Sequence, residues 1–161
     1  MKDAMVAYLT EHGYPVTDLS ATAGEDYPDV AERVARSVAR GAHERAVLVC
    51  GTGIGMAIAA NKIPGIRAAQ IPDSYSAERA RKSNDAQIAC FGSRTMGVEA
   101  ALLCLRHRLD SDFAGGTRPP RSRRSSRSSR ATCARPEHDA RAPSPGPRRP
   151  SPERRSRPCA Q

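Results

Sequence analysis

A short apolar run that ends in a glycine-rich turn constrains the fold of this chain more than any other feature. Residues 47–49, Val-Leu-Val, predict a buried strand. The following Cys50-Gly51-Thr52-Gly53-Ile54-Gly55 allows a tight turn, and a run of small residues then predicts a helix to about Lys62. A strand followed at once by a helix is the repeating unit of a parallel sheet covered by helices. The segment therefore favours an α/β fold.

The same turn carries chemically active groups. Cys50 would lie at the carboxyl end of its strand, where open α/β sheets bind their ligands. Amide groups of a glycine-rich turn can converge on an anion, and a thiol in such surroundings can act as a base or a nucleophile. The glycine spacing fits neither a dinucleotide fingerprint nor a P-loop. A cysteine that ends a strand is also a common packing residue, so the turn alone leaves both interpretations open.

The rest of the N-terminal part alternates between helical and extended patterns. Further strands are expected at residues 15–19, 66–71 and 87–91, and helices over residues 2–12, 26–41, 73–83 and 98–109. This alternation predicts a doubly wound parallel sheet sandwich of the flavodoxin/Rossmann-like kind, with helices on both faces. Such sheets normally begin with a strand, whereas this chain begins with a helix. We therefore expect the first strand to be missing, which leaves a gap between the strands at 15–19 and 45–49.

The C-terminal part differs sharply in composition from the rest. Residues 117–161 contain thirteen Arg, no Lys and three acidic residues, a net charge of +10 against +9 for the whole chain. They include nine Pro and eight Ser, and they lack Val, Ile, Leu, Met, Phe, Tyr and Trp. Because this segment cannot bury enough apolar surface to offset the entropy of ordering, we expect it to be a disordered tail. Residues 1–116 form the predicted domain, of a size typical for one core.

The arginine–serine run at residues 121–130 also permits a nucleic-acid interpretation, because clustered Arg neutralises phosphates. The tail has no aromatic side chain on which bases could stack. Its composition is equally that of a GC-rich gene read out of frame. We therefore expect an out-of-frame product or a neutral extension rather than a nucleic-acid module, and in either case the charge implies non-specific binding to polyanions.

Cysteine usage and targeting signals indicate the compartment. The chain has an odd number of cysteines without metal-ligand spacing, so neither a metal site nor a complete disulfide framework is expected. These are Cys50, Cys90, Cys104, Cys133 and Cys159. Neither a signal peptide nor a transmembrane run is recognisable. The prediction is a cytoplasmic protein that does not bind membranes.

A series of short motifs follows between Lys2 and Gly116. They are Asp26-Tyr27-Pro28-Asp29, the Cys50–Gly55 turn, Ala59-Ala60-Asn61-Lys62, Pro64-Gly65-Ile66-Arg67, Tyr75-Ser76-Ala77-Glu78-Arg79, Ser83-Asn84-Asp85-Ala86, Gly92-Ser93-Arg94 and Phe113-Ala114-Gly115-Gly116. In this order they resemble the ribose-5-phosphate isomerase B family, which includes galactose-6-phosphate isomerase subunits and tetrose-phosphate isomerases. The resemblance implies a five-stranded parallel sandwich that forms a homodimer, with each active site at the subunit interface.

The resemblance also implies an activity, the interconversion of aldose and ketose sugar phosphates through an enediolate without metal or organic cofactor. By position, Cys50 corresponds to the base that removes the proton next to the carbonyl, and Thr52 to a group that assists proton movement between the two oxygens. Amides of the turn would stabilise the enediolate charge. The implied substrate-binding residues are Tyr27, Gly51, Gly53, Ile54, Gly55, Asn84 and, near the sugar phosphate, Arg94.

The chain departs from the family pattern at three places. The family's first strand and an Asp-His-Ala-Gly turn would lie before Met1. Ser83 stands where ribose-5-phosphate isomerases of this type carry a His that helps to open the furanose ring, and a serine hydroxyl is a poor acid near neutral pH. That change favours the tetrose-phosphate branch. After Gly116 the tail replaces a His and two Arg that reach the phosphate, so no phosphate-binding residue is assigned there.

Three functions remain to be distinguished. The first is an isomerase of small sugar phosphates of the ribose 5-phosphate type, or of a tetrose phosphate, and it predicts that Cys50→Ala abolishes turnover without unfolding the chain. The second is a catalytically incomplete remnant that binds sugar phosphates. The third is a polyanion-binding protein that acts through its tail, for which RNA binding would depend strongly on salt and vanish on truncation after Gly116.

Overall fold

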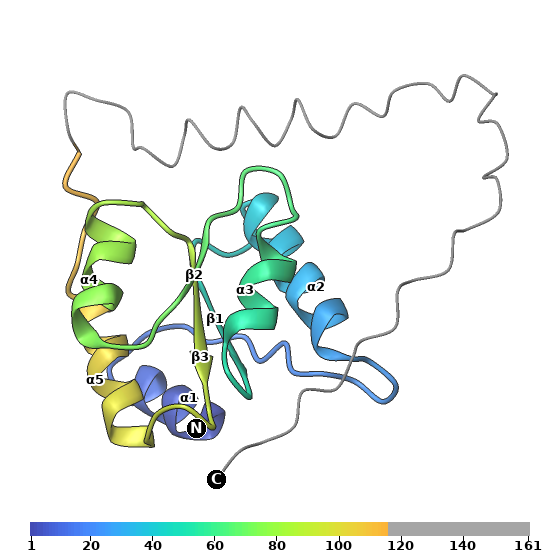
Figure 1. Cartoon of the computed structure of the whole chain (residues 1–161), viewed down its shortest axis with the longest axis horizontal. Helices are drawn as coiled ribbons and strands as arrows, with labels where there is room; N and C mark the ends of the chain where they lie inside the picture. Colours follow the sequence, from blue (N-terminus) through green and yellow to red (C-terminus); the bar gives the residue numbers. More distant parts are fainter. Residues whose placement is uncertain (116–161) are drawn as a thin grey trace, which may run out of the picture.

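The computed structural model describes residues 1–115. The predicted domain boundary after residue 116 and the predictions for the tail, residues 117–161, lie outside this range. Eight elements alternate along the described residues, in the order α1, α2, β1, α3, β2, α4, β3 and α5 (Figure 1). No helix among them is long and apolar enough to cross a lipid bilayer.

The three described strands form one parallel sheet, which confirms the predicted α/β class. They are β1 (Ala46–Cys50), β2 (Ala68–Gln70) and β3 (Ile88–Gly92), in the spatial order β1-β3-β2. β1 and β2 each pair with β3 in parallel, and the last residue of β1, Cys50, pairs with the last residue of β3, Gly92, at the carboxyl edge of the sheet. The order differs from a flavodoxin-like succession, because the last strand lies between the other two.

Helices cover both faces of the sheet (Figure 1). On one face lie α2 (Tyr27–Ala39) and α3 (Ile54–Ala60), and on the other lie α1 (Lys2–Glu11), α4 (Ser74–Lys82) and α5 (Val98–Leu109). Each layer needs its own apolar surface on the sheet, and the alternation of side chains along a strand supplies both.

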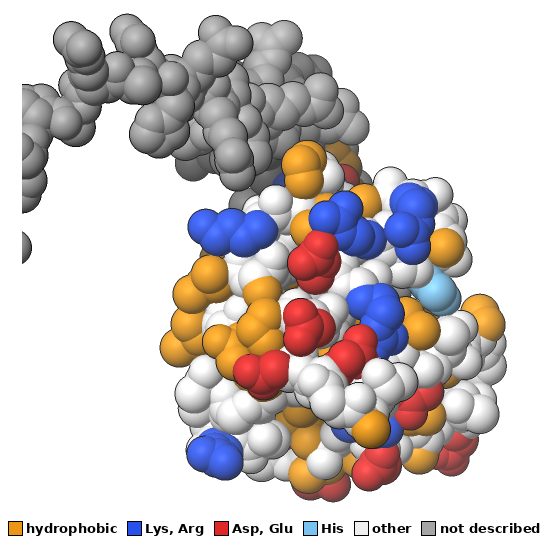
Figure 2. Space-filling model, turned by 90° about the vertical axis from the view of Figure 1, so that its right-hand side faces the viewer, with side chains coloured by type: hydrophobic (Ala, Val, Ile, Leu, Met, Phe, Trp, Pro, Cys, Tyr) orange, Lys and Arg blue, Asp and Glu red, His pale blue; other side chains and the backbone are white. Residues whose placement is uncertain are grey.

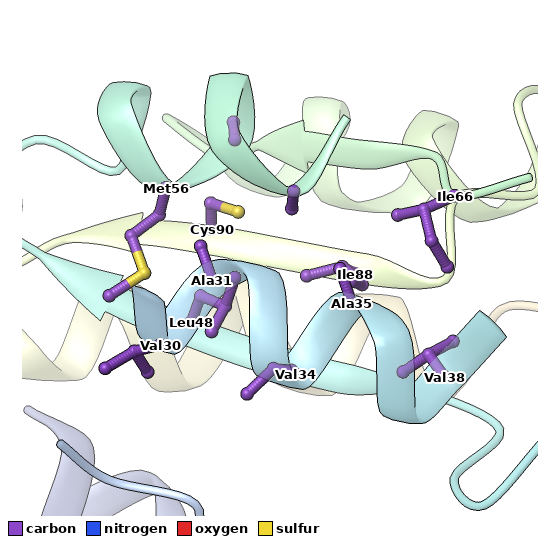
Figure 3. Packing of buried hydrophobic residues seen from close by; sticks show 12 residues of the cluster. Val30, Ala31, Val34, Ala35, Val38, Leu48, Met56, Ile66, Ile88 and Cys90 are labelled. Carbon is purple, nitrogen blue, oxygen red and sulfur yellow. The ribbon is translucent and has the colours of Figure 1, made fainter. Parts of the chain in front are cut away.

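The strand side chains divide between these two layers. Leu48, Ile88 and Cys90 are buried in the cluster beneath α2 and α3 (Figure 3). Ala89 and Phe91 are buried in the cluster beneath α4 and α5. The apolar stripe predicted for the second helix is buried as expected, at Val30, Val34 and Val38.

Local signals set the helix ends where the sequence predicts them. Asp26 caps α2 by accepting a hydrogen bond from the Tyr27 amide at 2.7 Å, and Asp73 caps α4 by accepting one from the Ser76 amide at 2.7 Å. After α1 the chain turns at Gly13, whose φ is +77°. These caps depend on neighbours in the sequence alone, so they can be recognised without the fold.

The strand predicted at residues 15–19 is wrong. Residues 14–20 are irregular and mostly exposed, and Tyr14 is 43% exposed. A strand forms only where a neighbour completes its ladder of hydrogen bonds, and in the described part of the chain β1 pairs with β3 alone. The segment is held by side chains instead: Lys2 Nζ donates to Asp18 Oδ2 at 2.9 Å and to Ser20 Oγ at 3.0 Å.

The predicted strand at residues 66–71 is shorter in the structure. At its outer edge the Asn61 side chain takes the place of a neighbouring strand, since Asn61 Oδ1 accepts from the Ala68 amide at 2.9 Å and Asn61 Nδ2 donates to the Ala68 carbonyl at 2.7 Å. The carboxamide thus satisfies both main-chain groups that Ala68 turns away from β3.

Candidate active site

The Cys50–Gly55 turn joins β1 to α3 at the carboxyl edge of the sheet, as predicted. Cys50 Sγ accepts a hydrogen bond from the Gly53 amide at 3.2 Å, and Thr52 Oγ1 accepts one from the Ile54 amide at 3.3 Å. The turn therefore presents a thiol and a hydroxyl together, each oriented by an amide of the same turn. Both side chains are accessible, because Cys50 is half-buried and Thr52 is exposed.

Glycine is required at position 53 for two reasons. Its φ is +77°, in the left-handed region, and a Cβ there would lie 2.9 Å from the Cys90 carbonyl oxygen in β3. The turn is thus pressed directly against the backbone of the central strand. Any side chain at this position would push the turn, and with it Cys50 Sγ, away from the sheet.

Tyr27 reaches the turn from a neighbouring element. It is the first residue of α2 and is 47% exposed. Its ring lies over Gly55, since a Cβ at Gly55 would approach Tyr27 Cε2 to 2.8 Å. The absence of a side chain at Gly55 therefore gives the tyrosine ring its place beside the turn, and the structure brings these two predicted residues together.

The loop after β3 forms the other side of the turn. The Ser93 amide donates to the Cys50 carbonyl at 2.8 Å, and the Arg94 amide donates to the Gly51 carbonyl at 2.9 Å. The Arg94 side chain lies beside Gly51, because a Cβ there would be 3.6 Å from Arg94 Cδ. Arg94 is exposed, and its guanidinium pairs with none of the carboxylates among residues 1–115. A positive charge is thus available next to the turn.

Two polar residues at this edge were not predicted. Gln70 Nε2 donates to the Thr52 carbonyl at 3.2 Å, and Ser93 Oγ donates to the Cys50 carbonyl at 3.1 Å. Their signal is positional, since Gln70 ends β2 and Ser93 follows β3, so both lie at the edge where Cys50 ends β1. Both support the turn through its backbone.

Asn84, the remaining predicted residue, lies at the opposite edge of the sheet. It follows α4, and its carbonyl accepts from Arg67 Nε at 3.0 Å. Arg67 directly precedes β2, whose first residue pairs with the first residue of β3, whereas Cys50 ends β1. The length of the strands, about 13 Å for five residues, separates the two edges. A single chain does not bring Asn84 to Cys50.

The three described cysteines are all free thiols, but only Cys50 is not buried. Burial, with a smaller contribution from the nearby Cys50, raises the pKa of the Cys90 thiol to about 12. Burial also raises the pKa of Cys104. Both buried thiols therefore stay protonated at neutral pH and are closed to a substrate, whereas Cys50 is the described thiol that a substrate can reach.

A shallow apolar hollow adjoins the turn. It has a volume of about 380 Å³ and is lined by Ile54, Ala57, Ile58, Asn61, Lys62 and Gln70. The outer side of α3 is unusually apolar for a surface, with Ile54 52% and Ile58 57% exposed. Hydrophobic side chains gather along one side of the face that α2 and α3 form (Figure 2).

Known proteins share both the sequence and the fold. The family described as Ribose/Galactose Isomerase matches residues 1–125. A ribose-5-P isomerase B of Listeria innocua is 52% identical over 118 residues, 72% of this chain and 80% of the relative. A D-erythrulose-4-phosphate isomerase of Pectobacterium atrosepticum is 48% identical over 124 residues, 75% of this chain and 82% of the relative.

A solved structure agrees with these matches. The structure of ribose-5-phosphate isomerase B from Clostridium thermocellum superposes with a TM-score of 0.77 at 37% identity, covering 81% of this chain and 90% of that one. The resemblance inferred from the motifs is thereby confirmed, and the chain belongs to the Ribose/Galactose Isomerase family of sugar-phosphate isomerases.

Proposed function

We propose that this chain isomerises a small aldose phosphate to the ketose phosphate through an enediolate, with Cys50 as the base. The observation that carries the proposal is the accessible Cys50 thiol, held by the Gly53 amide at 3.2 Å beside the Thr52 hydroxyl. The Cys50 thiolate removes the proton from the carbon next to the carbonyl and returns it to the neighbouring carbon. Thr52 passes a proton between the two oxygens, so no oxidant or reductant is needed.

The surroundings of the turn fit an anionic substrate. Charge that develops on the enediolate is stabilised by amides of the turn, and the exposed Arg94 guanidinium beside Gly51 binds the phosphate. Tyr27, over Gly55, bounds the sugar from the α2 side. These roles follow from placement around one turn, and each side chain approaches it from a different element.

Solvent exchange tests the enediolate. With ribose 5-phosphate in D2O, the product acquires deuterium at the carbon that receives the proton, because a cysteine proton exchanges with water before it returns. Cys50→Ser lowers both turnover and exchange. Product formed without deuterium, together with unchanged turnover in Cys50→Ser, would indicate direct transfer of hydrogen between the two carbons and would rule out the base.

The site needs a second copy of the chain. Asn84 lies a sheet length away from Cys50, so it can contact the same substrate only from the partner in a homodimer. The exposed Ile54 and Ile58 beside the turn offer an apolar surface that such a partner would cover. The proposed dimer thus places the Asn84 edge of one copy over the Cys50 edge of the other.

Complementation tests this arrangement. Cys50→Ala and Asn84→Ala are each inactive or impaired alone, but a refolded equimolar mixture regains roughly a quarter of wild-type activity, because half of the dimers carry one intact site. A mixture no more active than its components would place Asn84 outside the shared site.

Two substrates compete, and one observation separates them. Position 83, next to Asn84, carries an exposed serine and no imidazole to open a furanose ring. This favours D-erythrulose 4-phosphate, the substrate in the name of one relative, as a second candidate beside ribose 5-phosphate. Comparison of kcat/KM on both sugars decides between them. If the serine limits ring opening, Ser83→His raises kcat/KM on ribose 5-phosphate and leaves the tetrose value nearly unchanged.

A further inference from the structure

The turn that carries Asn84 has an unfavourable backbone conformation. Asp85 has a φ of +48° and is the only non-glycine residue with positive φ among residues 1–115. An aspartate tolerates this region better than most residues, but the conformation persists only where the surroundings enforce it.

Arg67, which directly precedes β2, binds this turn through its guanidinium. Its Nε donates to the Asn84 carbonyl at 3.0 Å and to the Asp85 carbonyl at 2.9 Å, and its Nη2 donates to Asp85 Oδ2 at 2.8 Å. Arg81 pairs with the other oxygen of the same carboxylate. The side chains of Arg67, Arg81 and Asp85 are only 19%, 14% and 23% exposed. The ion pairs are thus largely shielded from solvent. In such surroundings a charged pair is favourable only when its hydrogen bonds are well aligned.

The backbone of Arg67 is itself hydrogen-bonded to the start of β3. The Arg67 amide donates to Gln87 Oε1 at 2.9 Å, and the Arg67 carbonyl accepts from the Ile88 amide at 3.3 Å. Gln87 Nε2 donates in turn to the Gly65 carbonyl at 3.1 Å. The guanidinium therefore ties the Asn84–Asp85 turn to two strands. Main-chain hydrogen bonds also join the turn to α4, from the Asp85 amide to the Arg81 carbonyl at 3.0 Å and from the Ala86 amide to the Ala80 carbonyl at 2.8 Å.

We propose that Arg67 and Asp85 are positioning residues that set the placement of Asn84 for the substrate. This inference rests on the proposed function, in which Asn84 reaches the partner's site. Neither residue touches the turn that holds Cys50, so neither acts on the reacting atoms. Loss of the hydrogen bonds between Arg67 and the Asn84–Asp85 turn moves Asn84 and weakens substrate binding, while Cys50 and Thr52 stay in place.

The test compares Arg67→Met, Asn84→Ala and the double variant in the full chain. Arg67→Met is expected to raise KM on the better of the two sugar phosphates about tenfold with little change in kcat, and to add less than about twofold in the Asn84→Ala background. Arg67→Lys stays impaired, because an ammonium lacks the fork that bonds both carbonyls and the carboxylate. Arg33→Met is the matched control, since it removes a similar arginine–carboxylate pair, with Glu25, and leaves KM unchanged.

Asp85→Gly provides a second variant that keeps the fold. Glycine adopts the positive φ without strain but has no carboxylate, so KM rises as in Arg67→Met while thermal stability is less affected. Additive effects of Arg67→Met and Asn84→Ala, or an unchanged KM in Arg67→Met, would overturn the positioning role. If Asn84→Ala itself leaves KM unchanged, the positioning role also fails, and loss of activity in Cys50→Ala would still support the isomerase.

Discussion

At the carboxyl edge of the sheet, Cys50 and Thr52 are placed by backbone amides and by glycines that let strands and turn approach closely. At the amino edge, the Asn84–Asp85 turn is placed by arginine side chains and a carboxylate. The first arrangement leaves the thiol and hydroxyl accessible, with the exposed Arg94 guanidinium beside the turn. The second is stiff and highly charged. The groups proposed to move protons are thus held by the main chain, and Asn84, proposed to bind the substrate, is held by ion pairs.

The largest expected effect is at the carboxyl edge. Cys50→Ala lowers kcat by roughly a thousandfold or more, because it removes the proposed base and nothing else in the turn can replace it. Cys90→Ala, in the neighbouring strand, serves as the control, with a lower melting temperature but activity within a few-fold of wild type. Initial rates and thermal melts of both variants check this. Turnover retained in Cys50→Ala would remove the distinction between the two edges.

The next effect tests how strongly glycine packing places the turn. Gly53→Ala costs about 2–4 kcal/mol of stability and most of the activity, since it adds both left-handed strain and a contact with the Cys90 carbonyl. Gly41→Ala is the matched control, because Gly41 has a φ of +76° but open space around its Cβ position. It costs about 1–2 kcal/mol and keeps full activity. Equal losses in denaturant melts would show that close packing contributes nothing.

A smaller effect concerns the surface that would join the two edges in a dimer. Ile58→Glu places a charge on the apolar hollow beside α3 and weakens association by about tenfold or more. Activity then falls at low protein concentration and recovers at high concentration. Leu103→Glu, at a similarly exposed site on α5, leaves association unchanged. Sedimentation velocity over a concentration series measures both, and a monomeric wild type would contradict the shared site.

The smallest effect compares the ion pairs of Asp85 with a second part-buried pair, Arg33–Glu25. Hydrogen bonds from Arg33, and then from Thr22, lower the pKa of Glu25 from 4.5 to about 2. The folded state therefore gains stability above the unfolded pKa of about 4.5 and loses it as the pH falls toward 2. The difference in melting temperature between wild type and Glu25→Gln should be small at pH 6 and vanish near pH 2. A difference that grows in acid would reverse the assigned sign.

The sequence predicted the helices well because their signals are local. Asp26, Asp73 and Gly13 each act on residues within one turn, and all three work as expected. The strand at 15–19 failed for the opposite reason, since extended residues become a strand only beside a partner. The position of β3 between the other strands is likewise a property of the whole sheet.

The site divides in the same way. Cys50 and Thr52 share one turn, so the sequence alone places them together. Tyr27 and Arg94 were predicted only through the family resemblance, and the structure brings them to the glycines of that turn. Gln70 was not predicted because its contact is with the Thr52 carbonyl of another element, and the one signal for it is its position at the end of β2. The location of Asn84 at the far edge needed the strand register, which no motif reveals.

The hydrogen bonds between the Asn61 side chain and Ala68 make the two borders of the sheet unequal as places for a further strand. β2 has only three residues, and Asn61 already bonds the outward-facing amide and carbonyl of Ala68, so few main-chain groups are left to pair with another strand. The opposite border, β1, is longer, and no side chain in the described part of the chain bonds its outer main-chain groups in this way. A further strand would therefore pair with β1, next to the loop that begins at Cys50.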